Sequence, residues 1–451
     1  MMLILCPGLL SHIKNKKQIH MKRWFVLAAC LCLFATGVPA QKYVPAPENL
    51  ESRKEFAESR FGVFLHWGLY SMFAQGEWYM NNDSVDAREY AKAANAFYPH
   101  RFDAQAWVSA IKAAGAKYIC FTTRHHEGFS MWDTQYSDYN IMNTPYGRDV
   151  VRQLADECHR QGIKLHLYYS HIDWTREDYP AGRTGRGTKR LDRADWPTYY
   201  RFMNNQLTEL LTRYGEIGAI WFDGWWDHDV DTEPFDWELE EQYKLIHTLQ
   251  PGCLVGNNHH QVPFEGEDIQ IFERDVPGEN KAGLSGQDIS ALPLETCQTM
   301  NYSWGYRVTD HYYKSTKELI RLLVRTSGKG ANLLLNVGPQ PDGTLPEMAL
   351  ARLAEMGKWL DRYGESIYAT TAGGCNQGDS IITTRNGNSL YVHLLDTAID
   401  RVSMPLPQKV KRVEVLGENR RMDYTYKKGR LDFAVDIPDD CIDYVVKVTL
   451  K

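Results

Sequence analysis

Short apolar segments alternate with amphipathic ones along most of the chain. Residues 60–68, 117–129, 163–171 and 217–226 are strongly apolar, and each is followed by a stretch whose apolar residues recur every three or four positions. Gly or Pro follows most of these stretches, as is typical of helix C-termini. The alternation predicts parallel strands that are connected by helices.

Four further apolar segments continue this series and bring the expected number of strands to about eight. They cover residues 253–258, 268–274, 294–306 and 331–339. The strand count predicts an α/β fold with a (β/α)8-like barrel, whose active site lies where the strands end. Residues 41–56, which precede the first strand, are expected to form a polar linker.

The pattern changes after the last helical stretch, which ends near Gly364. Residues 380–396, "SIITTRNGNSLYVHLLD", place Asn-Gly between two alternating segments, which predicts a β-hairpin. We therefore expect a catalytic barrel over residues 41–368 and a small C-terminal all-β sandwich domain over residues 369–451.

The N-terminal region has the features of a secretory signal. A basic segment, Met21–Arg23, precedes an apolar run over residues 24–34 and small residues up to Ala40. We expect the protein to start at Met21, with residues 1–20 an upstream extension, and cleavage to follow Ala40. The predicted location is periplasmic or extracellular, and Cys30 leaves lipidation open.

The composition is that of a soluble globular protein, with 43% hydrophobic and 24% charged residues. A net charge of -6 argues against a nucleic-acid partner, because such proteins usually carry a basic surface. No segment beyond the leader is long and apolar enough to span a membrane. The remaining cysteines are scattered without Cys-x-x-Cys pairs, so neither a zinc site nor a disulfide framework is expected. A homo-oligomer stays open.

Several predicted strands end in polar residues, which a barrel would bring together at one mouth. They include His66, Tyr168, Asp223 and Glu273. Because strand side chains alternate, Trp221 and Asp223 share one face. Burying an ionised carboxylate is costly unless it is paired or used, so Asp223 is a candidate nucleophile or charge stabiliser. The alternative is that Asp223 only caps the following loop.

Metal binding is not expected, and no cofactor is predicted. His125 and His126 are adjacent, so on an extended strand they point in opposite directions and do not chelate one ion together. Acidic residues alternate over 227–233, but the calcium loop they suggest lacks glycine at its sixth position. A solvated acidic loop is the simpler interpretation.

Several motifs occur together in a consistent order between about residues 46 and 365. They are "FGVFLHWG", "EWY", "RHHEGFSMWDT", "WFDG", "LETC…SWGY" and "LLLNVGPQPDGTLP". Together they resemble α-L-fucosidases of glycoside hydrolase family 29, which remove terminal α-L-fucose from glycans with retention of configuration. The resemblance implies a (β/α)8-like barrel followed by a β-sandwich, and fucosylated oligosaccharides or glycoconjugates as substrates.

The resemblance also implies roles for individual residues. Asp223 in "WFDG" corresponds to the nucleophile, and the tentative acid/base is Glu295 in "PLETC", with Glu273 as second choice. Retaining glycosidases hold two such carboxylates about 5 Å apart. The implied substrate-binding residues are His66, Glu77, Trp78, His125, His126, Tyr168 and Trp221, and Arg274 beside Glu273 is a further candidate from the residues alone.

Two alternatives remain at this stage. One is a retaining glycosidase that acts on a related sugar such as α-L-galactose, since the sequence does not define the pocket around C6. The other is a catalytically inactive fucose- or glycan-binding protein, which would apply if no glutamate reached Asp223. The linkage and the leaving group are not defined by any motif.

Overall fold

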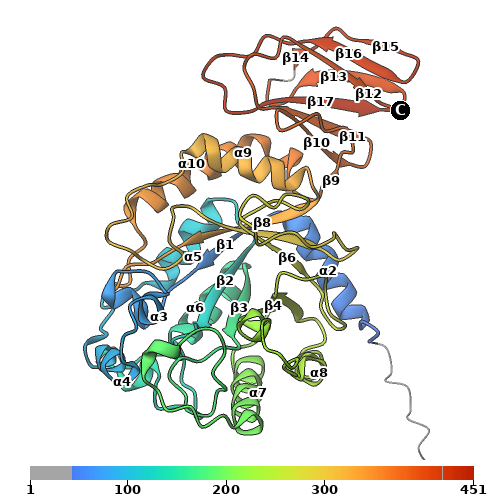
Figure 1. The fold of residues 1–451 in the computed structure, drawn as a ribbon. Coiled ribbons are helices and arrows are strands. Elements are labelled where there is room, and N and C mark those ends of the chain that lie inside the picture. The colour runs from blue at the N-terminus through green and yellow to red at the C-terminus, as the bar shows by residue number, and fades with distance from the viewer. Residues whose placement is uncertain (1–42, 419) are drawn as a thin grey trace, which may run out of the picture. The chain divides into compact units, whose positions relative to one another are not determined.

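The computed structural model describes residues 43–418 and 420–451 (Figure 1). The predicted leader over residues 1–40 lies outside this part of the chain, and the proposed start and cleavage site lie there too. Within the described part, no helix is both long and apolar enough to cross a bilayer. Pro45–Lys451 forms one compact unit.

Eight parallel strands form the predicted barrel, in the order β5-β4-β3-β2-β1-β8-β7-β6. The barrel closes almost completely, because a parallel bridge between Gly256 and Ile269 connects β5 to the segment before β6. The carboxyl ends of all eight strands therefore share one rim. The strands are β1 (Phe61–Leu65), β2 (Tyr118–Arg124), β3 (Lys164–Ser170), β4 (Ala219–Asp223), β5 (Leu254–Asn258), β6 (Gln270–Glu273), β7 (Leu294–Thr299) and β8 (Ala331–Val337).

Helices cover the barrel, but they do not follow every strand. Residues 259–293 contain no helix, so the connections after β5 and β6 are loops. Two short helices, α3 (Tyr79–Asn82) and α4 (Ala87–Ala91), lie in the connection after β1. The crossover helices are α5 (Ala104–Ala113), α6 (Val150–Gln161), α7 (Trp196–Arg213), α8 (Leu239–Leu249), α9 (Thr316–Ser327) and α10 (Glu347–Tyr363).

A helix replaces most of the predicted polar linker. α2 (Pro47–Ser59) begins with proline at a position that suits its fixed φ. Phe56 packs its ring 5.3 Å from that of Tyr118, at the start of β2, and its carbonyl accepts from the Asn332 amide at 2.6 Å. The linker prediction was wrong because only Asn49 and Phe56 of this helix are buried, so the segment has no continuous apolar stripe.

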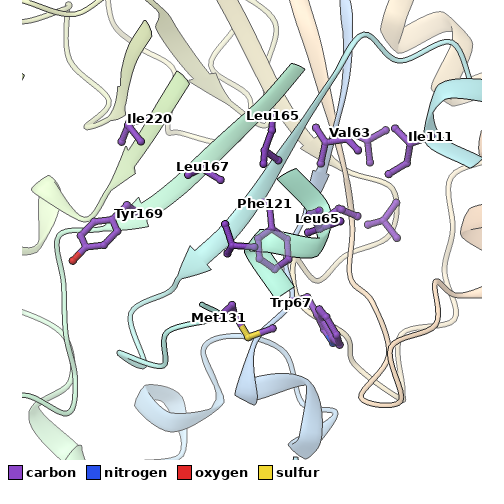
Figure 2. Close-up of a cluster of buried hydrophobic side chains, with 14 of the residues drawn as sticks. Val63, Leu65, Trp67, Ile111, Phe121, Met131, Leu165, Leu167, Tyr169 and Ile220 are labelled. Atoms are coloured by element: carbon purple, nitrogen blue, oxygen red, sulfur yellow. The ribbon is translucent and has the colours of Figure 1, made fainter. Parts of the chain in front are cut away.

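Alternate residues of each barrel strand enter two different cores. Outward-facing side chains such as Val63, Leu165 and Ile220 pack against the helices, including Ile111 of α5 (Figure 2). Inward-facing aromatic and aliphatic side chains fill the barrel interior in a separate cluster. The inner cluster determines which residues reach the mouth, because side chains of strand residues alternate between the two faces.

Antiparallel sheets follow the barrel, as the sequence predicts. β10 (Ile381–Asn386) and β11 (Ser389–Leu394) form the expected hairpin, with Gly387 in the left-handed region at φ 54°. A six-stranded sheet, β14-β13-β17-β11-β10-β9, and a three-stranded sheet, β12-β16-β15, share one apolar core. The remaining strands are β9 (Thr371–Ala372), β12 (Arg401–Pro405), β13 (Val410–Val415), β14 (Arg420–Arg421), β15 (Thr425–Lys427), β16 (Arg430–Ala434) and β17 (Tyr444–Leu450).

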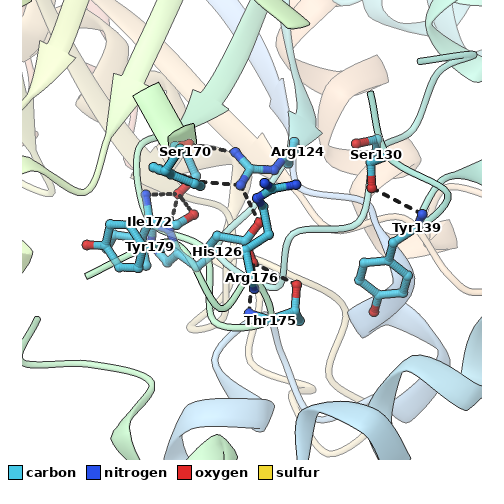
Figure 3. Close-up of polar contacts among 12 residues, drawn as sticks. Arg124, His126, Ser130, Tyr139, Ser170, Ile172, Thr175, Arg176 and Tyr179 are labelled. Atoms are coloured by element: carbon cyan, nitrogen blue, oxygen red, sulfur yellow. Dashed lines mark hydrogen bonds and ion pairs between the residues drawn. The ribbon is translucent and has the colours of Figure 1, made fainter. Parts of the chain in front are cut away.

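A buried arginine fixes the end of β2 to that of β3. Arg124 is fully buried, forms an ion pair with Asp173, and donates to the Ser170 carbonyl at 3.0 Å and to the Tyr199 hydroxyl at 2.9 Å (Figure 3). A buried guanidinium with several acceptors has most of its desolvation cost compensated. Because Arg124 directly precedes the two adjacent histidines, this network sets the position from which His125 enters the mouth.

Arg124→Met is expected to lower the free energy of unfolding by about 3–5 kcal/mol, because it leaves the buried Asp173 carboxylate unpaired. Lys92→Met is the matched control, since the Lys92–Glu89 pair is exposed and should contribute at most about 1 kcal/mol. Denaturant unfolding followed by tryptophan fluorescence measures both variants. Equal effects of the two substitutions would contradict the role assigned to Arg124.

Candidate active site

A cavity of about 210 Å³ lies at the carboxyl ends of the barrel strands. It contains most of the residues that the sequence indicated, although they come from separate strands and loops. A concave site with aromatic walls and a few convergent polar groups is the usual form of a small-ligand pocket. The predicted residues that line it are His66, Glu77, Trp78, His125, Tyr168, Trp221, Asp223 and Glu273.

Asp223 is the last residue of β4 and keeps 13% of its side chain exposed. Its Oδ1 accepts from the Gly224 amide at 2.9 Å and from the Trp226 indole at 3.0 Å, and its Oδ2 accepts from the Tyr168 hydroxyl at 3.0 Å. Gly224 has φ 106°, a backbone conformation that residues other than glycine rarely adopt. The carboxylate is therefore held in place by three donors and is more than a loop cap.

Glu273 is the last residue of β6, and 14% of its side chain is exposed. Its Oε2 lies 2.9 Å from the amide nitrogen of Asn258 and 3.1 Å from Nε2 of His260. The same Asn258 nitrogen lies 3.5 Å from Oδ1 of Asp223. One amide group thus bridges two carboxylates that come from different strands.

The two carboxylates have different electrostatic surroundings. Burial, and then the negative charge of Glu273, raises the pKa of Asp223 to about 6. Burial also acts to raise the pKa of Glu273, but the hydrogen bond and charge of His260, with Asn258 and Arg274, outweigh it and lower that pKa. In the ligand-free cavity, Asp223 is therefore the carboxylate that gains a proton first as the pH falls.

Three histidines in or beside the cavity are neutral rings. Burial is the main cause that lowers the pKa of His66 and of His126 to about 3, and it also lowers that of His125. Nδ1 of His66 lies 2.6 Å from the side-chain amide oxygen (Oδ1) of Asn336. Because this oxygen can only accept, Nδ1 carries the proton and Nε2 of His66 is the acceptor. Neutral imidazoles with a free acceptor suit the binding of ligand hydroxyls.

The adjacent histidines lie on the same side because β2 ends at Arg124. Their ring centroids are 4.2 Å apart, rather than on opposite faces of a strand. His125 lines the cavity, whereas His126 lies behind it, with Nε2 3.6 Å from Oδ2 of Asp223 and Nδ1 2.6 Å from the Ser170 hydroxyl. His126 therefore lies beside Asp223 and does not line the cavity.

Aromatic rings form most of the cavity wall. Trp78 stacks on Trp226 with centroids 5.7 Å apart, and Tyr168 stacks on Trp221 at 5.6 Å. Glu77 is almost fully buried, and its Oε2 accepts from the Gly305 amide at 2.7 Å. The walls thus combine apolar faces with fixed polar groups, which matches a ligand that has both.

The structure does not bring Glu295 to this cavity. Glu295 is fully buried in the barrel interior, where one oxygen accepts from the Tyr118 hydroxyl at 2.6 Å and the other from the Trp221 indole at 2.8 Å. It is the second residue of β7 and lies deep in the barrel, far from the end of the strand. Glu273, the second choice, is the glutamate that reaches Asp223.

Arg274 also lies outside the cavity lining. Its guanidinium contacts the Tyr302 carbonyl at 3.4 Å, lies over the Trp304 ring at 5.0 Å, and is 3.9 Å from Glu273. The backbone of Arg274 is left-handed, at φ 66°, which turns its side chain away from the path of β6. In the structure Arg274 contacts Glu273 and Trp304, and its role as a sugar contact stays a prediction.

Sequence reasoning missed several cavity residues. Asn258 ends a strand in a polar residue, the same signal that identified Asp223. His260 and Trp304 lie in loops, and Trp226 lies in a single 3-10 turn (Trp225–His228), where no periodicity indicates which way a side chain points. Arg183 belongs to the basic segment over residues 182–190 and reaches the cavity with its guanidinium 5.1 Å from the Trp226 ring.

The acidic segment after β4 (residues 227–233) is hydrogen-bonded to the rest of the protein through Asp227. Asp227 is fully buried and accepts from the Tyr179 hydroxyl at 2.7 Å and from the Thr184 amide at 2.8 Å. This part of the solvated-loop prediction was wrong, because the segment anchors the loop that carries Arg183. Among the residues that the structure describes, no cluster of three or more His, Cys, Asp or Glu side chains could hold a metal ion.

Comparison with known proteins gives one consistent family. The family model described as "Alpha-L-fucosidase" matches residues 31–365. An α-L-fucosidase from Dictyostelium discoideum is 31% identical over 377 residues, which cover 76% of this chain and 77% of that protein. Tissue α-L-fucosidase from Mus musculus is 27% identical and covers 92% of this chain and 96% of its own length.

Solved structures agree with these relatives. α-L-Fucosidase isoenzyme 1 from Paenibacillus thiaminolyticus superposes with a TM-score of 0.79 at 34% identity, covering 90% of this chain and all of that one. A Bacteroides thetaiotaomicron α-L-fucosidase gives a TM-score of 0.78 at 27% identity, covering 92% and 98%. That structure is a trapped covalent intermediate in complex with 2-fluoro-fucosyl fluoride, obtained with a glutamate-to-glutamine variant.

Relative to the wild type, the Glu295→Gln variant is expected to become more stable as the pH rises. Burial raises the pKa of Glu295 to about 7 from 4.5, despite hydrogen bonds from Tyr118 and Trp221. A carboxyl with a raised folded-state pKa loses stability as the pH rises from its unfolded value through its folded one, here by roughly 3 kcal/mol. Unfolding midpoints at pH 5 and pH 8 measure this difference. A constant gap between the two proteins would refute it.

Proposed function

The chain belongs to the α-L-fucosidase family of glycoside hydrolases, and we propose that Asp223 and Glu273 are the two carboxylates with which it hydrolyses terminal α-L-fucosides. The observation that carries this assignment is the Asn258 amide, which lies within 3.5 Å of an oxygen of each carboxylate. The same amide nitrogen thus reaches both carboxylates, so the two groups face one cavity, as a glycosidase's pair of carboxylates must.

In the first step, the Asp223 carboxylate attacks the anomeric carbon of the fucosyl group. The bond between that carbon and the leaving oxygen breaks, and the leaving oxygen takes the proton of the Glu273 carboxyl. Three donors already bind the Asp223 carboxylate, so the attacking group needs little rearrangement. The product of this step is a fucosyl ester of Asp223.

In the second step, Glu273 acts as a base. Its carboxylate takes a proton from water, the water oxygen bonds to the anomeric carbon, and the bond to Asp223 breaks, which releases fucose with its original configuration. The trapped covalent intermediate of the Bacteroides relative supports this two-step course.

Glu273 must be protonated before the first step, although its pKa is lowered in the ligand-free cavity. A bound sugar excludes water, and this desolvation favours the neutral acid. The nearby negative charge of Asp223 acts in the same direction. The bound substrate thus supplies the conditions under which Glu273 holds the proton that the leaving group needs.

The cavity walls fit a deoxy sugar. The neutral rings of His66 and His125 provide acceptors for hydroxyl groups of the sugar. Fixed polar groups of this kind discriminate against ligands that lack these hydroxyls. Aromatic side chains of the lining, such as Trp221, suit a C6 methyl group. A cavity of about 210 Å³ accommodates one terminal sugar, which supports exo-action on fucosylated oligosaccharides or glycoconjugates.

Two further expectations belong to this proposal. A catalytically inactive glycan-binding protein is disfavoured, because Glu273 lies where an acid/base is needed. We also propose that the protein is exported, on the basis of the apolar segment before Ala40. N-terminal sequencing of the protein from the periplasmic or extracellular fraction should give Gln41 as the first residue, and recovery only from the cytoplasm would refute export.

Azide rescue distinguishes the two roles. Asp223→Gly should lose activity on 4-nitrophenyl α-L-fucoside by about 10³-fold or more, and azide should restore turnover with formation of β-fucosyl azide. Glu273→Ala should give α-fucosyl azide with retained configuration. Product configuration is read by NMR.

Glu295→Gln is the matched control for this experiment. It replaces a buried glutamate that faces the same barrel but does not line the cavity, so its activity should stay within about tenfold of the wild type and azide should have no effect. Azide products from Glu295→Gln, or none from Glu273→Ala, would transfer the acid/base role away from Glu273.

The pH profile tests the electrostatics of the pair. Because Asp223 must be ionised to attack and its pKa is raised to about 6, kcat/KM for α-L-fucosyl fluoride should fall below about pH 6. Glu273→Gln removes the adjacent negative charge, so the acidic limb should move to lower pH. The fluoride needs no proton from Glu273 to leave, which keeps the variant measurable. An unmoved limb would show that the two groups are not coupled.

A further inference from the structure

A second hollow adjoins the catalytic cavity at the mouth of the barrel. It has a volume of about 580 Å³ and shares two of its lining residues, Glu77 and Trp78, with the cavity. One side consists of residues 75–82, and the other is the loop over residues 302–312 that follows β7. The two spaces therefore adjoin at Glu77 and Trp78.

Two exposed tyrosines dominate the outer side of this hollow. Tyr302 is 68% exposed and Tyr312 is 51% exposed, yet their rings stack with centroids 4.9 Å apart at an interplanar angle of 24°. Aromatic rings that remain open to water at the rim of a hollow are available to pack against a ligand there. We call Tyr302 and Tyr312 the tyrosine shelf.

The tyrosine shelf is held in a defined position. Oδ2 of Asp310 accepts from the amides of Tyr302 and Ser303, both at 2.9 Å, and from the Asn301 side chain at 2.8 Å. A bridge between Gln75 and Arg307 ties the same loop to the opposite side of the hollow. A loop that is fixed by several hydrogen bonds loses little conformational entropy when a ligand binds.

The tyrosine shelf is also connected to the acid/base candidate. Arg274 follows Glu273 in the chain, and its guanidinium contacts the Tyr302 carbonyl at 3.4 Å and the Glu273 carboxylate at 3.9 Å. Trp304, two residues after Tyr302, lines the catalytic cavity. The loop thus passes from the cavity wall to the tyrosine shelf, and Arg274 connects it to Glu273.

We propose that the tyrosine shelf is a subsite for the leaving-group sugar, so that the enzyme prefers fucosylated oligosaccharides over simple fucosides. This inference rests on the proposed function. The occupant is a neutral pyranose: its C–H face packs on the tyrosine rings, and its hydroxyls meet the polar side chains of Gln75, Asn82 and His311 that line the hollow. The hollow also carries both Arg307 and Asp310, so it has no single charge that would select an ionic ligand.

The test compares two substrates that differ only beyond the fucosyl group. α-L-Fucosyl fluoride releases a single atom and does not reach the hollow, whereas fucosyl-lactose isomers with α1,2 and α1,3 linkages place a sugar there. The variant Y302A/Y312A should lose about tenfold or more in kcat/KM on at least one isomer and less than about twofold on the fluoride.

Tyr98→Ala is the matched control, because Tyr98 is 56% exposed and stacked on His100 but lines neither space. It should leave both substrates unaffected. Equal losses on fluoride and oligosaccharide, or no loss on either, would overturn the tyrosine shelf as a subsite. Hydrolysis of the fluoride by the wild type would still support the fucosidase assignment in that case. If the wild type cleaves neither substrate, the proposed function fails, and the subsite fails with it.

Discussion

Two carboxylates that repel each other, Asp223 and Glu273, are held in one cavity closely enough to contact the same amide group of Asn258. Such a pair is unfavourable in a low-dielectric site unless donors surround it. The surrounding structure provides these donors from three directions: the Gly224 amide, the Tyr168 hydroxyl and the His260 ring. The barrel makes this possible because Asp223 and Gly224 lie at the end of β4, Glu273 at the end of β6, Tyr168 near the end of β3 and His260 in the loop after β5.

The two irregular connections of the barrel have a direct consequence for the site. After β5 and β6 the chain forms loops where helices would normally follow, and these loops bring His260 and Leu284 to the cavity. Long loops on a rigid scaffold commonly carry function. At the opposite end of the barrel, Phe56 of α2 packs against the interior cluster, so the carboxylates lie at the end that this helix does not cover.

The fold and the nucleophile candidate could be predicted because both depend on local periodicity. Alternation along β4 places Trp221 and Asp223 on the inner face, and the strand ends at Asp223. The adjacent histidines were harder, since their shared orientation depends on β2 ending one residue before them. Residues of connecting segments, such as Trp226 and Trp304, could not be placed, because their directions come from tertiary contacts such as the stacking of Trp226 on Trp78.

The two glutamates show why residue type and motif do not define an acid/base. Ile271 pairs with Glu295 and Glu273 pairs with Cys297, so Glu295 lies two residues below Glu273 along the barrel axis. Two strand residues span roughly 6–7 Å, which is more than a side-chain carboxyl can compensate within a packed interior. At its own level in the barrel, Glu295 instead accepts hydrogen bonds from Tyr118 and Trp221, and these bonds fix the floor of the cavity. Position along the strand thus determines which glutamate reaches the cavity beside Asp223, and this register is set by pairing between β6 and β7, which no single segment of the sequence contains.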